Sequence, residues 1–208
     1  MNLLNIRWLA FLPLVFSKIP DHRFVHRSQD DFNKLTDWPC PPAEEISPCQ
    51  CGQRGDSPAK LELFCDGVVE VEEIERVFSV EFPFNNLEFI TLIANDDNLW
   101  TNHSAVVIPQ NIFKDKTAKD VWMGINVAEI HPLAFEKMAD TLTSLSISGP
   151  GFVDGVNQIE YFPIYILEHF PNLKWFMLQE TMLLDQTFEW HEFELPLFSE
   201  MFLPNLGK

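Results

Sequence analysis

The sequence predicts an α/β solenoid with a short-stranded parallel sheet on its concave side and mixed 3₁₀ turns, helix and coil on its convex side. One apolar pattern recurs four times: an apolar residue, two variable residues, an apolar residue, one variable residue and a third apolar residue. It begins at Leu87, Ala118, Leu142 and Leu173, so successive starts lie 31, 24 and 31 residues apart. Repetition at such a period is typical of solenoids, in which each repeat adds one unit to a stack. Four clustered cysteines that precede the first repeat are the second observation.

The N-terminal residues are expected to lie outside the solenoid. Arg7 is followed by an apolar run from Trp8 to Phe16, which is shorter than the ~20 residues of a membrane span. Residues 1–17 are therefore interpreted as a secretory signal peptide, with a buried N-terminal strand as the alternative. Residues 18–38 are polar, mixed in charge and without strand or helix periodicity, which predicts a disordered leader or a removable pro-segment.

All four cysteines lie in residues 39–66, a segment rich in Pro, Cys and Gly. Cys49-x-Cys51 is tighter than a usual zinc half-site and no second such pair follows, so disulfides are favoured over a metal site. Together with Cys40 and Cys65 these residues allow three pairings, and the spacing does not choose between them. We expect this segment to be a cross-linked cap that covers the apolar end of the stack.

The repeats are predicted to occupy residues 67–208. The cap strand is expected at Leu61–Cys65, and a convex helix or turn at Val71–Phe78. Insertions after the strands, at residues 96–107, 150–158 and roughly 185–194, should fall on one edge of the solenoid, where binding often happens. Asn102 begins the sequence Asn-His-Ser in the first insertion, which predicts a glycosylation site on a surface loop.

The complete pattern Leu87-x-x-Ile90-x-Leu92-x-x-Asn95 resembles the leucine-rich repeat. The segment Cys40-Pro41-Pro42…Cys49-Gln50-Cys51…Cys65 resembles the N-terminal cysteine cap of extracellular proteins of this class. The resemblance implies the bridges Cys40–Cys51 and Cys49–Cys65. It also implies that Asn95 and Asn126 bond free backbone groups at the turn that follows each strand.

Residues 39–208 are also similar to a narrower group, the secreted arthropod leucine-rich repeat proteins related to the non-catalytic subunit of Oplophorus luciferin 2-monooxygenase. The similarity is carried by Cys40-Pro41-Pro42, Phe64-Cys65-Asp66, Ile108-Pro109-x-x-x-Phe113 and Phe170-Pro171-Asn172-Leu173. It implies a secreted subunit that holds no cofactor and does not itself oxidise luciferin. The sequence stops at Leu206-Gly207-Lys208, inside the next repeat, so we expect a truncated solenoid whose open C-terminal end associates with another chain.

The candidate binding site is the concave face of the predicted sheet. Alternate side chains of a strand point to opposite faces, so residues between the buried positions should point outward. Because strands lie about 4.8 Å apart, these residues should form rows across the sheet. The predicted face consists of Phe89, Thr91, Asp120, Trp122, Ser144, Ser146, Trp175 and Met177. Aromatic residues dominate interface hot spots, but these side chains would serve no partner if they only covered backbone or packed beneath the insertions.

The charge of the chain restricts its partners. Acidic residues outnumber basic ones 31 to 14, and the formal net charge is −17. Such a surface repels nucleic-acid phosphates and anionic lipid headgroups, and it attracts basic partners or simply keeps the protein soluble. No segment after the signal is long and uncharged enough to span a bilayer.

Sequence motifs of catalysis are missing, because the chain has no nucleophile elbow, phosphate-binding loop, dinucleotide fingerprint or zinc-protease motif. We therefore expect a non-enzymatic, extracellular leucine-rich repeat module that holds a protein partner on its concave face or insertion loops. It would be a non-catalytic subunit or a partner-binding protein. The alternative is a fragment of a leucine-rich repeat receptor or adhesion ectodomain.

Overall fold

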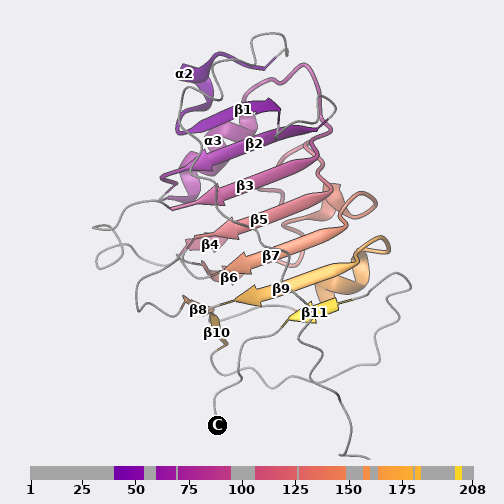
Figure 1. Ribbon diagram of the computed structural model, residues 1–208. Helices are drawn as coiled ribbons and strands as arrows, with labels where there is room; N and C mark the ends of the chain where they lie inside the picture. The colour runs from indigo at the N-terminus through magenta and orange to yellow at the C-terminus, as the bar shows by residue number, and fades with distance from the viewer. Residues whose placement is uncertain are drawn as a thin grey trace, which may run out of the picture.

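The computed structural model of the chain describes residues 40–53, 60–68, 70–94, 106–125, 127–148, 157–159, 164–179, 181–183 and 200–202. These residues form a mixed α/β fold built on one seven-stranded sheet (Figure 1). The expectations for residues 1–38, for Asn95, Asn102 and Asn126, and for most of the three insertions fall outside the described residues.

The strands of the sheet follow one another in the order of the sequence. They are β1 (Cys49–Gln53), β2 (Leu61–Asp66), β3 (Phe89–Ile93), β5 (Asp120–Gly124), β7 (Ser144–Ser148), β9 (Trp175–Gln179) and β11 (Glu200–Phe202). β1 is antiparallel to β2, and every later neighbour is parallel. Because parallel neighbours need a crossover connection, a return segment must join each parallel strand from β2 to β9 to the next strand of the sheet.

The four segments that carry the apolar pattern lie side by side in this sheet. Phe89 is in register with Asp120, Asp120 with Ser144, and Ser144 with Trp175. The residue that follows each of these is buried and belongs to the core, as Ile90 illustrates. The recurring apolar positions therefore stack on top of one another, because a strand of five residues can bury its apolar side only by aligning with its neighbours.

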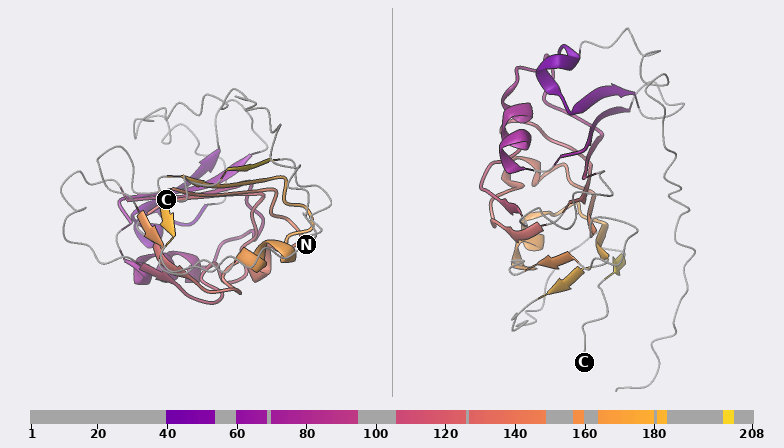
Figure 2. Two further views of the ribbon diagram at one scale, coloured as in Figure 1. Left: turned by 90° about the horizontal axis from the view of Figure 1, so that it is seen from below. Right: turned by 90° about the vertical axis from the view of Figure 1, so that its left-hand side faces the viewer.

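The return segments form a second layer on one side of the sheet (Figure 2). This layer includes the helix α3 (Val71–Ser79) and the 3₁₀ helices η1 (Glu136–Met138) and η2 (Ile164–His169). α3 agrees with the helix or turn expected at Val71–Phe78. Glu72 and Glu73 lie in its first turn and Arg76 in its last turn, which suits the charges of the helix ends.

The sequence did not indicate two small parallel sheets in the return layer. β4 (Val106–Ile108) pairs with β6 (Val127–Ile130), and β8 (Asn157–Ile159) pairs with β10 (Thr181–Leu183). β-Branched residues in β4 and β6 favour extended backbone, but segments of three or four residues carry too little periodicity to be recognised. The second half of a repeat therefore contains strand as well as helix and coil.

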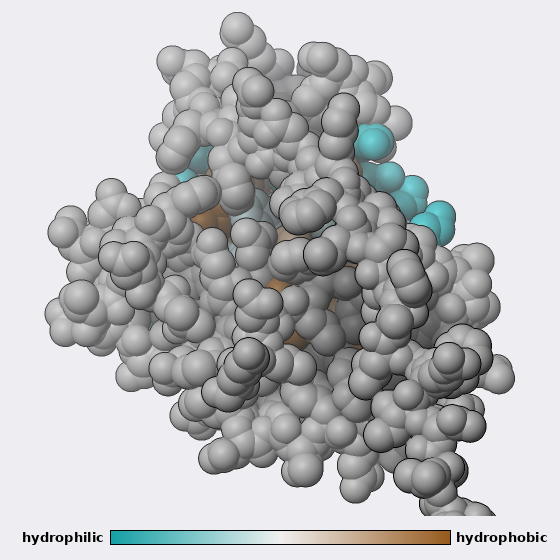
Figure 3. Space-filling model, turned by 60° about the horizontal axis from the view of Figure 1, so that its bottom comes forward, coloured by the Kyte–Doolittle hydropathy of each residue, from teal (hydrophilic) through white to brown (hydrophobic). Residues whose placement is uncertain are grey.

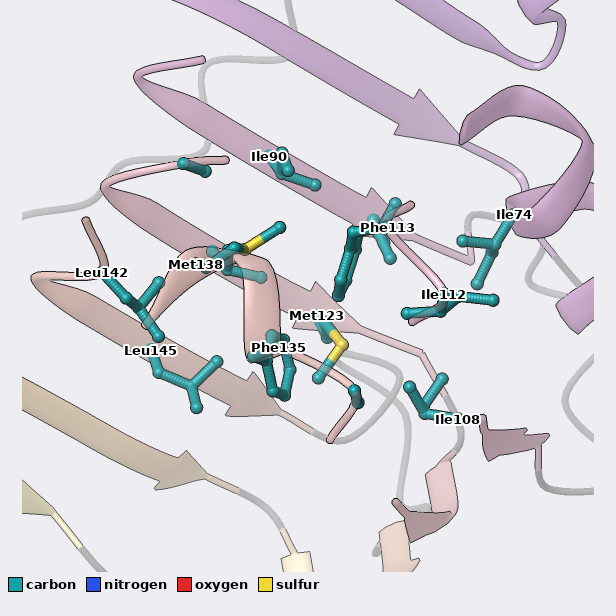
Figure 4. Close-up of a cluster of buried hydrophobic side chains, with 14 of the residues drawn as sticks. Ile74, Ile90, Ile108, Ile112, Phe113, Met123, Phe135, Met138, Leu142 and Leu145 are labelled. Atoms are coloured by element: carbon teal, nitrogen blue, oxygen red, sulfur yellow. The ribbon is translucent and has the colours of Figure 1, made fainter. Parts of the chain in front are cut away.

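A row of phenylalanines fills the space between the two layers. Phe78 packs edge-on against Phe113, with ring centroids 5.0 Å apart, and Phe113 stacks on Phe135 at 5.3 Å. Phe135 in turn meets the edge of Phe170 at 6.2 Å. All four side chains are buried. Figure 4 shows Phe113 and Phe135 among aliphatic and methionine side chains of the core cluster, so the return layer is aligned from repeat to repeat as the strands are.

Two disulfides, Cys40–Cys51 and Cys49–Cys65, cross-link the N-terminal cap. This is the pairing that the resemblance to extracellular cysteine caps implies. Cys49 and Cys65 are paired directly across β1 and β2, and both are buried. The second bridge therefore ties the antiparallel edge strand to the first parallel strand.

The cap also contains a short helix, α2 (Ala43–Ile46), that the sequence did not indicate. The Arg76 guanidinium of α3 donates to the Glu45 carbonyl at 2.7 Å and also to the Ser47 carbonyl. These bonds satisfy carbonyl groups at the end of α2. Arg76 thus joins the cap to the first return segment.

Asp115 and Lys116 form an ion pair in the turn that precedes β5. The Lys116 side chain is buried, and its Nζ lies 5.2 Å from the ring centroid of Phe82. The hydrogen bond from Lys116 is the main cause that lowers the pKa of Asp115 below its usual value of 3.8. A carboxylate with a lowered pKa contributes stability above the pKa of the unfolded chain, and this contribution is lost as the pH falls through the folded-state pKa.

We therefore expect the wild type to be slightly more stable than an Asp115→Asn variant at neutral pH. The difference should be at most about 1 kcal/mol, because the Asp115 side chain is 60% exposed and solvent screens the pair. It should vanish as the pH is lowered below 3.8. Urea unfolding of both proteins across that pH range measures it, and a difference that persists into strong acid would contradict this role of the pair.

Candidate functional site

The side of the sheet opposite the return layer is the candidate site, and we call it the outer face. Figure 1 looks onto it. It is formed by the strand residues that alternate with the buried positions. The outer face comprises Glu62, Phe64 and Asp66 of β2; Phe89, Thr91 and Ile93 of β3; Asp120, Trp122 and Gly124 of β5; Ser144, Ser146 and Ser148 of β7; and Trp175 and Met177 of β9.

All eight residues predicted for the binding face lie on this outer face, in two rows. The first row runs Phe89, Asp120, Ser144, Trp175, and the middle row runs Thr91, Trp122, Ser146, Met177. Figure 3, in which the bottom of Figure 1 comes forward, shows hydrophobic residues near the middle of the view and hydrophilic residues at its right-hand edge.

Trp122 lies over the sheet. Its Nε1 donates a hydrogen bond to Ser148 Oγ at 3.1 Å, which reaches from β5 to the neighbouring β7. A Cβ atom at Gly124 would lie 3.8 Å from Cζ2 of this indole and 3.5 Å from Ser148 Oγ, which are ordinary contact distances, so the ring packs beside Gly124. The indole is fixed by a polar contact at one end and remains half-buried, which suits a rigid aromatic contact surface.

Two of the predicted residues are less accessible than expected. Thr91 is 4% exposed and Ser146 is 5% exposed, so neither side chain offers a direct contact to a partner. Thr91 donates a hydrogen bond to Glu62 Oε1 at 3.1 Å. Ser146 is in register with Trp122 on one side and Met177 on the other, and its short side chain lies between these two long ones. The accessible part of the face is therefore the first row with Trp122 and Met177.

The sequence-based prediction omitted the contribution of β2 to the outer face. Glu62 is in register with Phe89, and Phe64 with Thr91, so β2 extends both rows by one position. Lys60, two residues before Glu62, places its Nζ 5.7 Å from the ring centroid of Phe89. The alternation of apolar and polar residues from Leu61 onward is the signal for this outward-facing strand, which the sequence predicts only as part of the cap.

Polar contacts hold the acidic side chains of the first row. Besides the bond from Thr91 to Glu62, Thr143 Oγ1 donates to Asp120 Oδ1 at 3.0 Å. The carboxylates of Glu62 and Asp120 thus flank Phe89 on the two neighbouring strands. This arrangement combines an aromatic ring with negative charge on both sides.

A cleft of about 340 Å³ lies elsewhere, beyond the end of α3. It is lined by residues 78–82 and 114–116, which include the Asp115–Lys116 pair. None of the eight predicted residues lines it. In the described part of the chain, no group of three or more His, Cys, Asp or Glu is arranged to hold a metal ion. Among those same residues, no helix is both long and apolar enough to cross a bilayer.

No protein-family model matches the chain, and neither a curated protein nor a solved structure matches it significantly.

Proposed function

We propose that this protein is a secreted leucine-rich repeat module that binds a protein partner on the outer face of its sheet. The repeat assignment is supported by four equivalent five-residue strands in one register, and by described return segments that lie on one side of the sheet. The two disulfides of the cap are compatible with an extracellular protein, because such bonds persist in oxidising compartments.

The observation that carries the binding proposal is the arrangement of aromatic residues on this face. Phe89, Trp122 and Trp175 come from three strands and are half-buried, so each exposes part of its ring. Partly exposed aromatic residues on a rigid sheet lose little conformational entropy when a partner covers them. Three serines on β7 separate β5 from β9, and two of them, Ser146 and Ser148, are buried.

The role that we propose is non-catalytic. The sequence similarity to the secreted arthropod proteins described above implies a subunit that holds or stabilises another chain. We propose that this protein likewise holds or stabilises another chain. The aromatic and short polar side chains of the predicted face suit recognition of a protein surface.

We expect Trp175→Ala to weaken the binding of peptides that are selected on the wild-type protein. Random peptides displayed on phage would be selected on the immobilised protein, and the affinity of the enriched ones would be measured for each variant. Loss of a central aromatic contact should weaken binding by more than about tenfold.

Val107→Ala is the matched control for this experiment. Val107 is the large hydrophobic residue that is 50% exposed, and it lies on β4 in the return layer. Its replacement should leave binding unchanged. If the selected peptides bind Trp175→Ala as tightly as the wild type, the outer face is not the binding surface and the proposal fails.

A further inference from the structure

We propose that the Phe89 position of the outer face receives an arginine or lysine side chain of the partner, and that Lys60 of this chain occupies the same position when no partner is bound. This inference rests on the proposed binding function and specifies the chemistry of the partner. The observation that motivates it is a ring between two carboxylates that already carries an ammonium group of the same chain.

The geometry of the first row favours a cation. Phe89 is in register with Glu62 on one side and with Asp120 on the other, so both acidic residues lie one strand spacing from Phe89. The face of an aromatic ring attracts cations electrostatically, and neighbouring carboxylates strengthen the attraction. The Lys60 ammonium, 5.7 Å from the ring centroid, lies within the usual range of a cation–π contact.

The two carboxylates are also oriented by their neighbours. Thr91 donates to Glu62 Oε1 and Thr143 donates to Asp120 Oδ1. Glu62 is only 5% exposed, so water screens its charge less than it would at an open surface. Asp120 is half-buried, so it is the carboxylate of this pair that a partner side chain can reach.

Lys60 can be displaced from this position. It is an exposed residue that precedes β2, and a cation–π contact at an exposed site is weak. A partner guanidinium can stack on the ring and bond a carboxylate at the same time, which an ammonium on a flexible stem does less well. The net charge of −17 adds a general attraction for basic partners but does not select a place on the surface.

The test uses a synthetic peptide of alternating Arg and Ser as the probe, with Gln–Ser and Glu–Ser peptides of the same length as comparisons. Fluorescence anisotropy at physiological ionic strength measures binding to the full chain. We expect the Arg peptide to bind most tightly. Lys60→Ala should tighten its binding by about two- to fivefold, because the competing ammonium has been removed. Asp120→Asn should weaken binding by a similar factor.

Two variants separate this local effect from net charge. Lys137→Ala changes the charge as Lys60→Ala does, but Lys137 is an exposed residue of η1 in the return layer. Glu129→Gln likewise matches Asp120→Asn and lies on β6. If Lys60→Ala and Lys137→Ala tighten binding equally, or if the two acidic variants weaken it equally, charge alone explains the result and the inference is overturned.

Two different results with the selected peptides distinguish loss of the basic partner from loss of the binding face. Selected peptides that need Trp175 but show no preference for Arg or Lys would overturn the basic partner and leave the binding face in place. Selected peptides that do not need Trp175 would remove the binding face itself. Lys60→Ala and its control Lys137→Ala both replace exposed side chains, so their folding is not expected to limit the comparison.

Discussion

Phe135→Ala is expected to destabilise this protein by about 3–5 kcal/mol, the usual cost of removing a buried phenylalanine. Phe135 is fully buried and is one of the two inner members of the phenylalanine row, with ring contacts to Phe113 and to Phe170. Its loss would leave a cavity between two adjacent return segments. Because domains of this size are stable by only about 5–15 kcal/mol, a large part of the stability should disappear. Urea unfolding followed by tryptophan fluorescence and circular dichroism measures the change.

Two companion variants make this result interpretable. Phe135→Leu should cost less than Phe135→Ala, because its side chain refills part of the cavity. Val107→Ala should change the stability by no more than about 0.5 kcal/mol, since half of that side chain is already in water. An equal effect of Phe135→Ala and Val107→Ala would show that the phenylalanine row does not hold the return layer together.

Removal of the Cys49–Cys65 bridge is expected to have the second-largest effect. The sequence separation of 16 residues predicts a loss of about 3 kcal/mol from the greater entropy of the unfolded chain. Both cysteines are buried and face each other across β1 and β2, so the double variant Cys49→Ala/Cys65→Ala should also weaken packing at the capped end of the sheet. Urea unfolding under non-reducing conditions measures the loss.

The Cys40–Cys51 bridge provides the matched comparison, because it has a similar separation of 11 residues but involves two half-buried cysteines. We expect Cys40→Ala/Cys51→Ala to be less destabilising than the loss of the buried bridge. Thiol titration of the denatured wild type should find no free cysteine, since both pairs are bonded. A larger effect of the Cys40–Cys51 variant would mean that the buried bridge is not the principal link between cap and sheet.

The eight residues predicted for the binding face share one side of the sheet, but the burial of Thr91 and Ser146 was not expected, and it has a physical reason. Alternation within each strand correctly distinguished outward residues such as Trp122 and Trp175 from the buried Val121 and Phe176. The accessibility of outward residues could not be obtained in this way. Thr91 is buried against Glu62, which lies 29 residues earlier in the chain, and the bond from Trp122 to Ser148 spans 26 residues. Such contacts depend on which long side chains meet across strands.

The second halves of the repeats were less predictable for a different reason. The helix α3 spans nine residues and carries both charge and apolar periodicity, so it was recognised. β4, β6, β8 and β10 have three or four residues each, and they are extended because they pair with one another. Their backbone conformation is a consequence of stacking, not of local preference.

By itself the sequence determined that equivalent strands stack in parallel register and which side chains point into the core. The apolar period alone carries that information, because each short strand can hide its apolar positions only beneath the same positions of its neighbours. Only the tertiary structure decided which outward side chains remain accessible. It also decided that Lys60 lies over Phe89, whose neighbours on the adjacent strands are Glu62 and Asp120. These properties arise between residues distant in the chain, where side-chain length and hydrogen bonding across strands determine the outcome.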